Sequence, residues 1–360
     1  AKAAELAAYG DADAWVGLPP AAECGLAGGD LQTDDPAYAA LDRDALLRQV
    51  IAAEKIAMGV DPRITNAHRS GVSARRNENW YGTTDGVRVQ RGGTGFGYHV
   101  VVVAQSASGE RQMGSHHTSS RRLAGLWDAE TVGSEAGRRA VRFYDWRKVP
   151  TGPCRVLFDN ESASDLIDIV IGGCSGSAVY RGSTYLAGSL GQTIASDQLT
   201  VVDDPLIPGD LASRPCDGEG VKSRLTTIID GGRLASFLVA GSAARRLKHP
   251  YTGHDGGSSN LKVKPGTASF ADLVSELGTG LIVHDLHGFG VDIASGQYSR
   301  GVSGYWVENG KIVHPVQEVT IAGNLKELLP GIRAVGNDPL AQSSTASPSL
   351  LIDGFTVGGA

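Results

Sequence analysis

The chain has 360 residues, is 41% hydrophobic and carries a formal net charge of −6. This length and apolar content predict about two domains, each with a core of its own. The mild, unclustered negative charge argues against nucleic acid as the main partner. Because no apolar run reaches about 18 residues, we expect no membrane span.

The cysteines and the first residues bear on the compartment. The four cysteines are far apart and form no C-x-x-C pair, which predicts reduced thiols in a cytoplasmic protein (Cys24, Cys154, Cys174 and Cys216). The first residues contain no apolar signal-peptide core. The chain starts with Ala1 rather than Met, so we expect that a segment of the natural N-terminus is missing.

The first predicted domain, residues 1–149, is an N-terminal α/β region. Its Ala-rich start is followed by a loop with two consecutive prolines, and strands are expected between residues 63 and 120. Apolar residues at helical spacing predict helices over 37–60 and 128–147. Asp42 lies near the front of the first of these, where the helix dipole favours acidic residues.

The second predicted domain, residues 150–360, is largely antiparallel β-structure with a few packed helices, which makes the whole chain α+β. Its first strand is followed by a helix that we expect to be capped by Asn160. Asn309-Gly310 predicts a hairpin turn, and residues 342–349 predict a flexible loop. Further strands are expected at 198–203, 225–230, 233–240, 280–285, 302–307, 311–313 and 316–321, and helices at 241–247, 268–277 and 324–329.

Several ordered blocks resemble one known family. They include "RKVPTGPCRVLFDNE", "SAARRLKHPYTGHDGGSSN", "GFGVDIASGQYSRGVSGYWVENGKIVHPVQEVTIAGNLKELL" and the following "AVGND". Together they resemble the TldD/PmbA family, and within it the PmbA branch, also called TldE. The resemblance is strong over residues 140–338 and looser over 37–103.

This resemblance implies a cytoplasmic metallopeptidase system built from two related chains. The TldD chain carries zinc on an H-E-x-x-x-H motif and a late cysteine, whereas the TldE chain lacks that site. The pair acts on unfolded or precursor peptides. We therefore expect a TldD-like zinc subunit as the heterodimer partner, peptide as the substrate, and no zinc or other cofactor in this chain.

The segment "NESASD" falls where the resemblance places the zinc motif. Asn160 and Asp165 stand in the positions of the two histidines, and Glu161 in that of the general base. The late cysteine is also missing, since "ASPSLLID" contains none. An Asn amide oxygen is neutral and ligates zinc poorly. Two interpretations of Glu161 stay open: a first-turn acid stabilised by the helix dipole, or a residual group beside a shared substrate channel.

Other residues offer weaker alternatives. A rebuilt zinc site from four histidines has no recognised ligand spacing (His249, His254, His284 and His287). His116 and His117 are expected in an exposed turn, and Cys174 has no identifiable base. The alternative functions are therefore an independent metallopeptidase, or a self-associating peptide-binding protein that forms a homodimer. In the two-chain peptidase that the resemblance implies, an extended peptide can be held by strand addition.

Overall fold

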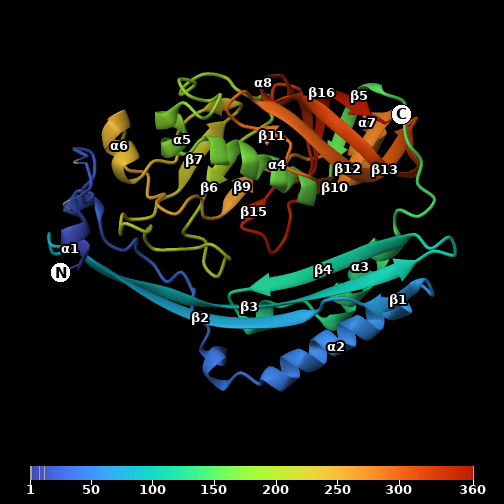
Figure 1. Ribbon diagram of the computed structural model, residues 1–360, viewed down its shortest axis with the longest axis horizontal. Helices are drawn as coiled ribbons and strands as arrows, with labels where there is room; N and C mark the ends of the chain where they lie inside the picture. Colours follow the sequence, from blue (N-terminus) through green and yellow to red (C-terminus); the bar gives the residue numbers. More distant parts are fainter. Residues whose placement is uncertain (1, 8, 12, 360) are drawn as a thin grey trace.

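The computed structural model describes residues 2–7, 9–11 and 13–359. Ala1 and Ala360, the outer ends of the two predicted domains, are therefore not among the described residues. A smaller N-terminal body of sheet and helices lies below a larger C-terminal body (Figure 1). Both bodies contain helices and strands, which confirms the predicted α+β class. No helix in the described part is both long and apolar enough to cross a membrane.

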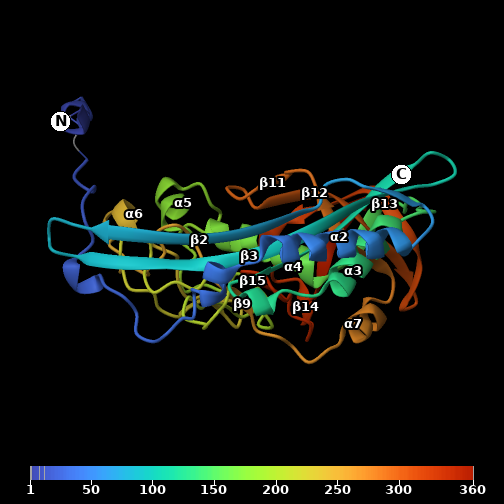
Figure 2. The same cartoon turned by 90° about the horizontal axis from the view of Figure 1, so that it is seen from below.

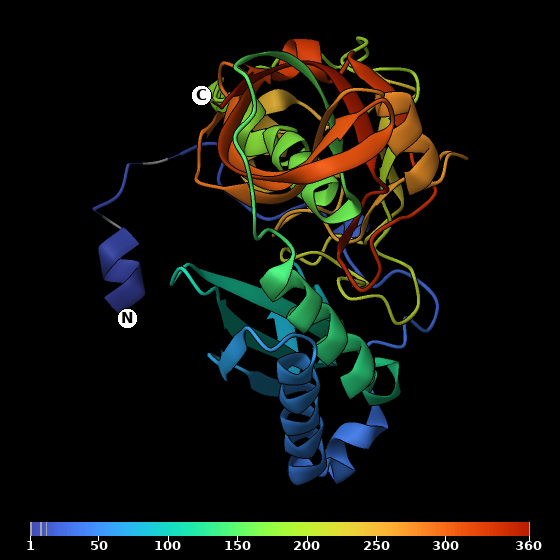
Figure 3. The same ribbon diagram turned by 90° about the vertical axis from the view of Figure 1, so that its right-hand side faces the viewer.

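The N-terminal body is built on an antiparallel sheet around one long strand, β3. β4 pairs along one side of β3, and β2 and β1 follow one another along the other side. The strands are β1 (Ile64–Ala67), β2 (Gly71–Gly82), β3 (Arg88–Gln105) and β4 (Arg111–Ser120). Two helices cover one face of this sheet, as Figure 3 shows, and alternate residues of β3 pack beneath them.

The two helices of this body are shorter than predicted. In place of one helix over 37–60 there is a 3-10 helix, η2 (Pro36–Ala40), and then α2 (Arg43–Gly59). The break has a local cause, because the Asp42 carboxylate caps α2 by accepting from the Ala45 backbone N–H at 3.0 Å. α3 (Ala129–Val141) ends before the predicted residue 147, since the chain turns there. Short helices complete this part of the chain: α1 (Lys2–Ala7), η1 (Ala21–Glu23) and η3 (Leu123–Gly125).

The main sheet of the C-terminal body closes on itself. Its strands are β5 (Gly152–Phe158), β10 (Gly280–His287), β11 (Val291–Asp292), β12 (Gln297–Glu308), β13 (Lys311–Asn324), β14 (Ile332–Val335) and β16 (Leu350–Gly358). They follow the order β10-β5-β16-β13-β12-β11, and a further pairing of β10 with β12 closes a ring. Asn309 and Gly310 both have positive φ at the β12–β13 turn, which confirms the predicted hairpin. The two strands expected at 311–313 and 316–321 are one strand, β13.

A second, smaller sheet and several short helices complete this body. The strands are β6 (Val201–Asp203), β7 (Thr226–Asp230), β8 (Arg233–Leu234), β9 (Leu261–Val263) and β15 (Thr345–Ala346). The helices are α4 (Asn160–Gly173), α5 (Gly176–Arg181), α6 (Gly241–Leu247), α7 (Phe270–Leu277) and α8 (Leu325–Leu328). The strand predicted at 233–240 and the helix predicted at 324–329 were therefore too long.

The predicted flexible loop at 342–349 is wrong for most of its length. β15 pairs with β9, and residues 345–349 are buried. Polar contacts with α4 explain the burial: the Thr345 hydroxyl donates to Asp168 at 2.6 Å, and the Ser347 N–H donates to the Ser164 hydroxyl at 3.1 Å. These partners are distant in sequence, so the local composition cannot reveal them.

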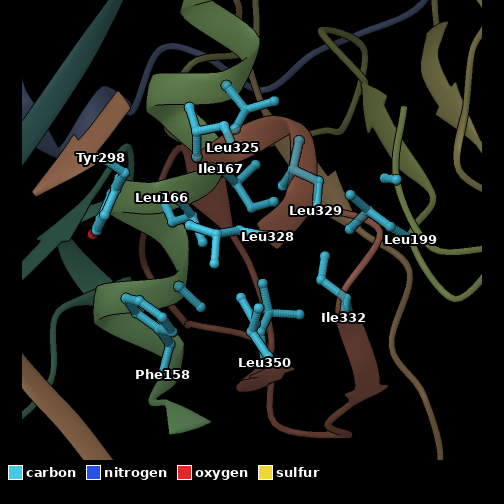
Figure 4. Close-up of a cluster of buried hydrophobic side chains, with 14 of the residues drawn as sticks. Phe158, Leu166, Ile167, Leu199, Tyr298, Leu325, Leu328, Leu329, Ile332 and Leu350 are labelled. Carbon is cyan, nitrogen blue, oxygen red and sulfur yellow. The ribbon is translucent and has the colours of Figure 1, made fainter. Parts of the chain in front are cut away.

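Helix α4 lies against the inside of the ring of strands (Figure 3). Its apolar side chains pack with those of the ring and of the smaller sheet, as Figure 4 shows for Leu166, Ile167, Phe158 and Leu199. All four side chains are fully buried. Burying a side chain of this size contributes about 1.5–3 kcal/mol, so this core holds α4 firmly and fixes the direction of its polar face.

Candidate functional site

Helix α4 carries the altered zinc-motif residues, and Asp159 rather than Asn160 caps it. The Asp159 carboxylate accepts from the Ser162 N–H at 2.8 Å, and Asn160 is already helical. The predicted cap is therefore wrong by one residue. Instead, the Asn160 side-chain amide nitrogen donates to the Asp338 carbonyl at 2.9 Å. That contact ties the start of α4 to the segment after β14.

Glu161 is bound by an arginine from the other body of the protein. Arg139 of α3 donates through two nitrogens to the two Glu161 oxygens, at 2.9 and 2.5 Å, and also contacts Glu135. Burial opposes the Arg139 charge, but the two glutamates outweigh it and raise the pKa of Arg139. Glu161 is therefore one half of an ion pair that joins the two bodies, which neither interpretation from the sequence foresaw.

Two further acids follow Glu161 along the same face of α4. Asp165 lies one helical turn on and Asp168 almost two turns on. Burial raises the pKa of Asp165, opposed by the charge of Arg300 and reinforced by Asp168 and Glu161. Burial also raises the pKa of Asp168, although the Thr345 hydroxyl partly stabilises its charged form. Both carboxyls therefore ionise less readily than free aspartates.

These acids line a pocket of about 250 Å³ between the two bodies. Its other walls are His116 and His117 of β4, Trp127, and residues 340–343 with Thr345. Pockets for drug-sized ligands usually span about 300–1,000 Å³. The pocket therefore accommodates one or two side chains rather than an enclosed peptide.

The histidines of this pocket lie in a strand, not in the predicted exposed turn. His116 and His117 both belong to β4, where His117 is exposed and His116 is half-buried. The His116 ring stacks on Trp127 with centroids 5.3 Å apart. Burial, together with the charge of Arg139, lowers the pKa of His116 to about 4. His116 is therefore neutral at pH 7, and its Nδ1 atom has no hydrogen-bond partner in the described structure.

One loop residue connects the pocket wall to the N-terminal sheet. The Gln342 side-chain oxygen accepts from the Thr118 hydroxyl at 2.7 Å and from the Ser119 N–H at 3.0 Å. Its side-chain nitrogen donates to the Gly125 carbonyl at 2.9 Å. Gln342 thus anchors the 340–343 loop against β4 and sets the width of the pocket.

The four histidines of the alternative site make separate contacts. His254 is buried, with Nε2 at 2.8 Å from Asp203 and Nδ1 at 2.9 Å from the Thr252 hydroxyl. His284 lies 2.6 Å from Asp159, and His287 and His249 contact the Ser303 hydroxyl and the Pro250 carbonyl. Among the described residues, no group of three or more His, Cys, Asp or Glu has an arrangement that could hold a metal ion.

The fold and this site define a two-body α+β protein with a carboxylate-lined pocket between its bodies. Two family models match the chain, the PmbA/TldA metallopeptidase central domain over residues 37–144 and its C-terminal domain over 151–359. The chain therefore belongs to the PmbA/TldD metallopeptidase family, as the sequence blocks predicted.

Individual relatives agree with this assignment. Metalloprotease PmbA of Escherichia coli O157:H7 is 34% identical over 357 residues, which are 99% of this chain and 79% of that protein. A crystal structure from Bacteroides thetaiotaomicron, described as a candidate modulator of DNA gyrase, has a TM-score of 0.93 at 26% identity and covers 99% of this chain and 81% of its own. TldE of Thermococcus kodakarensis has a TM-score of 0.84 at 22% identity, covers 99% and 83% of the two chains, and shows the shared fold alone.

Sequence reasoning singled out the altered motif on α4 but not the residues that surround it. Arg139, His116 and Trp127 come from the N-terminal body, and Gln342 comes from a segment interpreted as flexible. No spacing within one segment signals a contact between two bodies. The adjacent arginines in "GRRAV" are the one local hint, because Arg139 falls on the inward side of α3 while Arg138 stays exposed.

Proposed function

We propose that this chain is the non-catalytic, PmbA/TldE-type subunit of a cytoplasmic two-chain metallopeptidase. A TldD-like partner supplies the zinc and the catalytic base, and the substrates are unfolded or precursor peptides. Family membership supports the metallopeptidase system. The observation that carries the silent role is the Arg139–Glu161 ion pair at the motif position.

The chemistry of α4 opposes zinc in three ways. The Asn160 amide group is directed by its contact with the Asp338 carbonyl, and its oxygen carries no charge to offer a cation. Arg139 places a positive charge on Glu161, where a zinc ion and a water to be activated belong in a zinc peptidase. Asp165 alone gives one carboxylate, whereas catalytic zinc sites use three protein ligands. These donors do not fit zinc.

The test is metal content by elemental analysis, first on the chain purified alone and then on the chain copurified with a TldD-like protein. We expect no stoichiometric zinc in the chain alone, about one zinc per pair in the complex, and peptide hydrolysis by the complex only. Chelator-sensitive hydrolysis by the chain alone would overturn the proposal and favour the independent metallopeptidase.

A self-associating peptide-binding protein is the second candidate. It is favoured by the outer edge of β2, which pairs only with β3 among the described strands and so offers backbone groups to another chain. A genome survey separates the two candidates. A neighbouring gene that encodes H-E-x-x-x-H in the same frame supports the two-chain peptidase, and the absence of any such chain supports self-association.

A further inference from the structure

The two acids that follow Glu161 on α4 have no cationic partner. Arg139 neutralises Glu161, whereas neither Asp165 nor Asp168 forms an ion pair with a lysine or arginine in the described part of the chain. The Asp168 carboxylate accepts one hydrogen bond, from Thr345, and both aspartate side chains are exposed. Like charges one helical turn apart repel each other. A cation placed between the two carboxylates is therefore stabilised by both.

The spacing of these carboxylates suits a guanidinium group. Residues i and i+3 of a helix are neighbours, with Cβ atoms about 5–6 Å apart. The planar fork of an arginine side chain presents donors on more than one side, so it can donate to both carboxylates at once. A lysine ammonium is a compact point charge without this reach. The polar face of α4 therefore favours arginine over lysine.

The aromatic wall of the pocket also admits a cationic side chain. Trp127 lines the pocket with its ring stacked on His116, and aromatic rings attract guanidinium groups. Burial and the charge of Arg139 lower the pKa of His116 to about 4, so this wall is uncharged at pH 7. Two positive charges near this face are already engaged. Arg139 binds two glutamates, and Arg300 donates to the His287 carbonyl at 3.2 Å.

Two buried polar atoms near these acids lack a partner. In the described structure neither the His116 Nδ1 atom nor the Tyr298 hydroxyl makes a hydrogen bond. Tyr298 is fully buried, and burial raises its pKa, opposed by the charge of Arg300 and reinforced by that of Asp165. A buried polar group without a protein partner requires an explanation from outside the chain, such as water or a ligand. The chain's own groups thus leave this face of α4 unsatisfied.

Two further hollows adjoin the pocket, which lies where α4 and the segment before β15 stand over β4 (Figures 1 and 2). It shares His116 and His117 with an open hollow of about 510 Å³ over the N-terminal sheet. It shares Asp168 with a second pocket of about 330 Å³ beside the start of α5. A side chain in the central pocket can therefore belong to a chain that continues on both sides.

We propose that the central pocket is a specificity subsite for a basic side chain, arginine in preference to lysine, carried by a peptide that continues into the two adjoining hollows. Asp165 and Asp168 bind the guanidinium group, and Trp127 packs against it. This inference rests on the proposed function for the peptide, and it adds the chemical class of side chain that the pocket selects.

The test is calorimetric binding of short peptides to the chain alone. Four N-acetylated Gly/Ser peptides differ in one central residue, which is arginine, lysine, citrulline or leucine. Citrulline has the shape of arginine without its charge. We expect the arginine peptide to bind about tenfold more tightly than the citrulline peptide, with the lysine peptide between them, because hydrogen bonds between charged groups are the stronger ones. Equal affinity for arginine and citrulline overturns the proposal, as does an arginine peptide that does not bind.

Isosteric variants locate the subsite. Asp165→Asn and Asp168→Asn each remove one charge, and we expect each variant to bind the arginine peptide about tenfold more weakly and the leucine peptide as before. Asp230→Asn removes an exposed acid of β7 that does not line the pocket, and it leaves arginine binding unchanged. Circular dichroism verifies that every variant is folded. Wild-type affinity for the arginine peptide in both α4 variants overturns the proposal.

These outcomes separate the subsite from the two-chain peptidase. Arginine-selective binding by the chain alone upholds the subsite even if the copurified complex hydrolyses no peptide, a result that counts against the peptidase role alone. Conversely, zinc-dependent hydrolysis by the complex without any preference for arginine at the pocket overturns the subsite and leaves the peptidase role intact.

Discussion

Replacing Arg139 by methionine tests the ion pair that joins the two bodies. Methionine keeps the unbranched stem and removes the charge, so Glu161 loses its cation and Glu135 keeps only its contact with Arg138. The Arg139 side chain is 19% exposed, Glu161 36% and Glu135 29%. Removing one partner of a fully buried pair costs about 3–5 kcal/mol, and an exposed pair is worth about 0–1 kcal/mol. This half-buried site lies between those limits, and we expect about 2 kcal/mol.

A double-mutant cycle isolates the pair itself. Urea unfolding is measured for wild type, Arg139→Met, Glu161→Gln and the combined variant. We expect a coupling energy of about 1–2 kcal/mol, because the second substitution costs little once the first has removed the pair. A coupling indistinguishable from zero, with m-values unchanged, would refute the reasoning, since two residues in a bidentate contact cannot act independently.

The pH dependence of the same variant supplies a second check. Burial tends to raise the pKa of Glu135, but hydrogen bonds from Arg139 and Arg138 outweigh it and lower the pKa. A carboxyl whose pKa is lower when folded stabilises the protein fully above its unfolded pKa and loses that effect as pH falls through the folded value. In Arg139→Met this acid-sensitive part of the stability shrinks, so the loss of stability between pH 7 and pH 3 becomes smaller.

Three further predictions concern groups away from this pair. Asp203→Asn removes the buried carboxylate that contacts His254 and accepts two hydrogen bonds from Ser259, the Asp203 and His254 side chains being 0% and 1% exposed. We expect about 3 kcal/mol of lost stability in urea titrations, and a loss under about 1 kcal/mol contradicts the importance of this hydrogen-bond network. Asp159→Ala removes both the α4 cap and the His284 contact and costs about 2 kcal/mol by the same assay. Burial raises the pKa of the Cys174 thiol to about 12. Burial also raises the pKa of the Cys154 thiol, to about 11, although a backbone hydrogen bond opposes this shift. We therefore expect that neither thiol reacts with a disulfide reagent at pH 7.5 until the protein is unfolded.

Elements with strong local signals could be predicted from the sequence. The strands expected between residues 63 and 120, the helices expected at 241–247 and 268–277 and the Asn309-Gly310 turn depend on neighbouring residues, and the structure confirms them within a few residues. The errors occur where distant partners decide. The Ser/Thr-rich stretch at 342–349 resembles a loop by composition, yet Asp168 and Ser164 of α4 supply the hydrogen bonds that bury it.

The candidate site shows the same division. The acids of α4 share one face because of helical spacing, which the sequence reveals. The residue that caps α4 could not be predicted in this way. Asp159 and Asn160 are both good capping residues, and only the contacts with Ser162 decide between them. Arg139 reaches Glu161 because α3 and α4 meet across the two bodies, and no local rule predicts that approach.

Restoring the histidines of the family motif is the sharpest test of why α4 is silent. If ligand identity were the whole cause, Asn160→His/Asp165→His would bind zinc. The structure indicates a second cause, because Arg139 would still hold a positive charge on Glu161 between the two new ligands. We therefore expect the double variant to bind no more zinc than wild type, and a triple variant with Arg139→Met to bind measurably more, by elemental analysis after dialysis. Stoichiometric zinc in the double variant would show that the metal displaces Arg139 from Glu161. The ion pair would then be a consequence of the lost histidines and not an independent barrier to zinc binding.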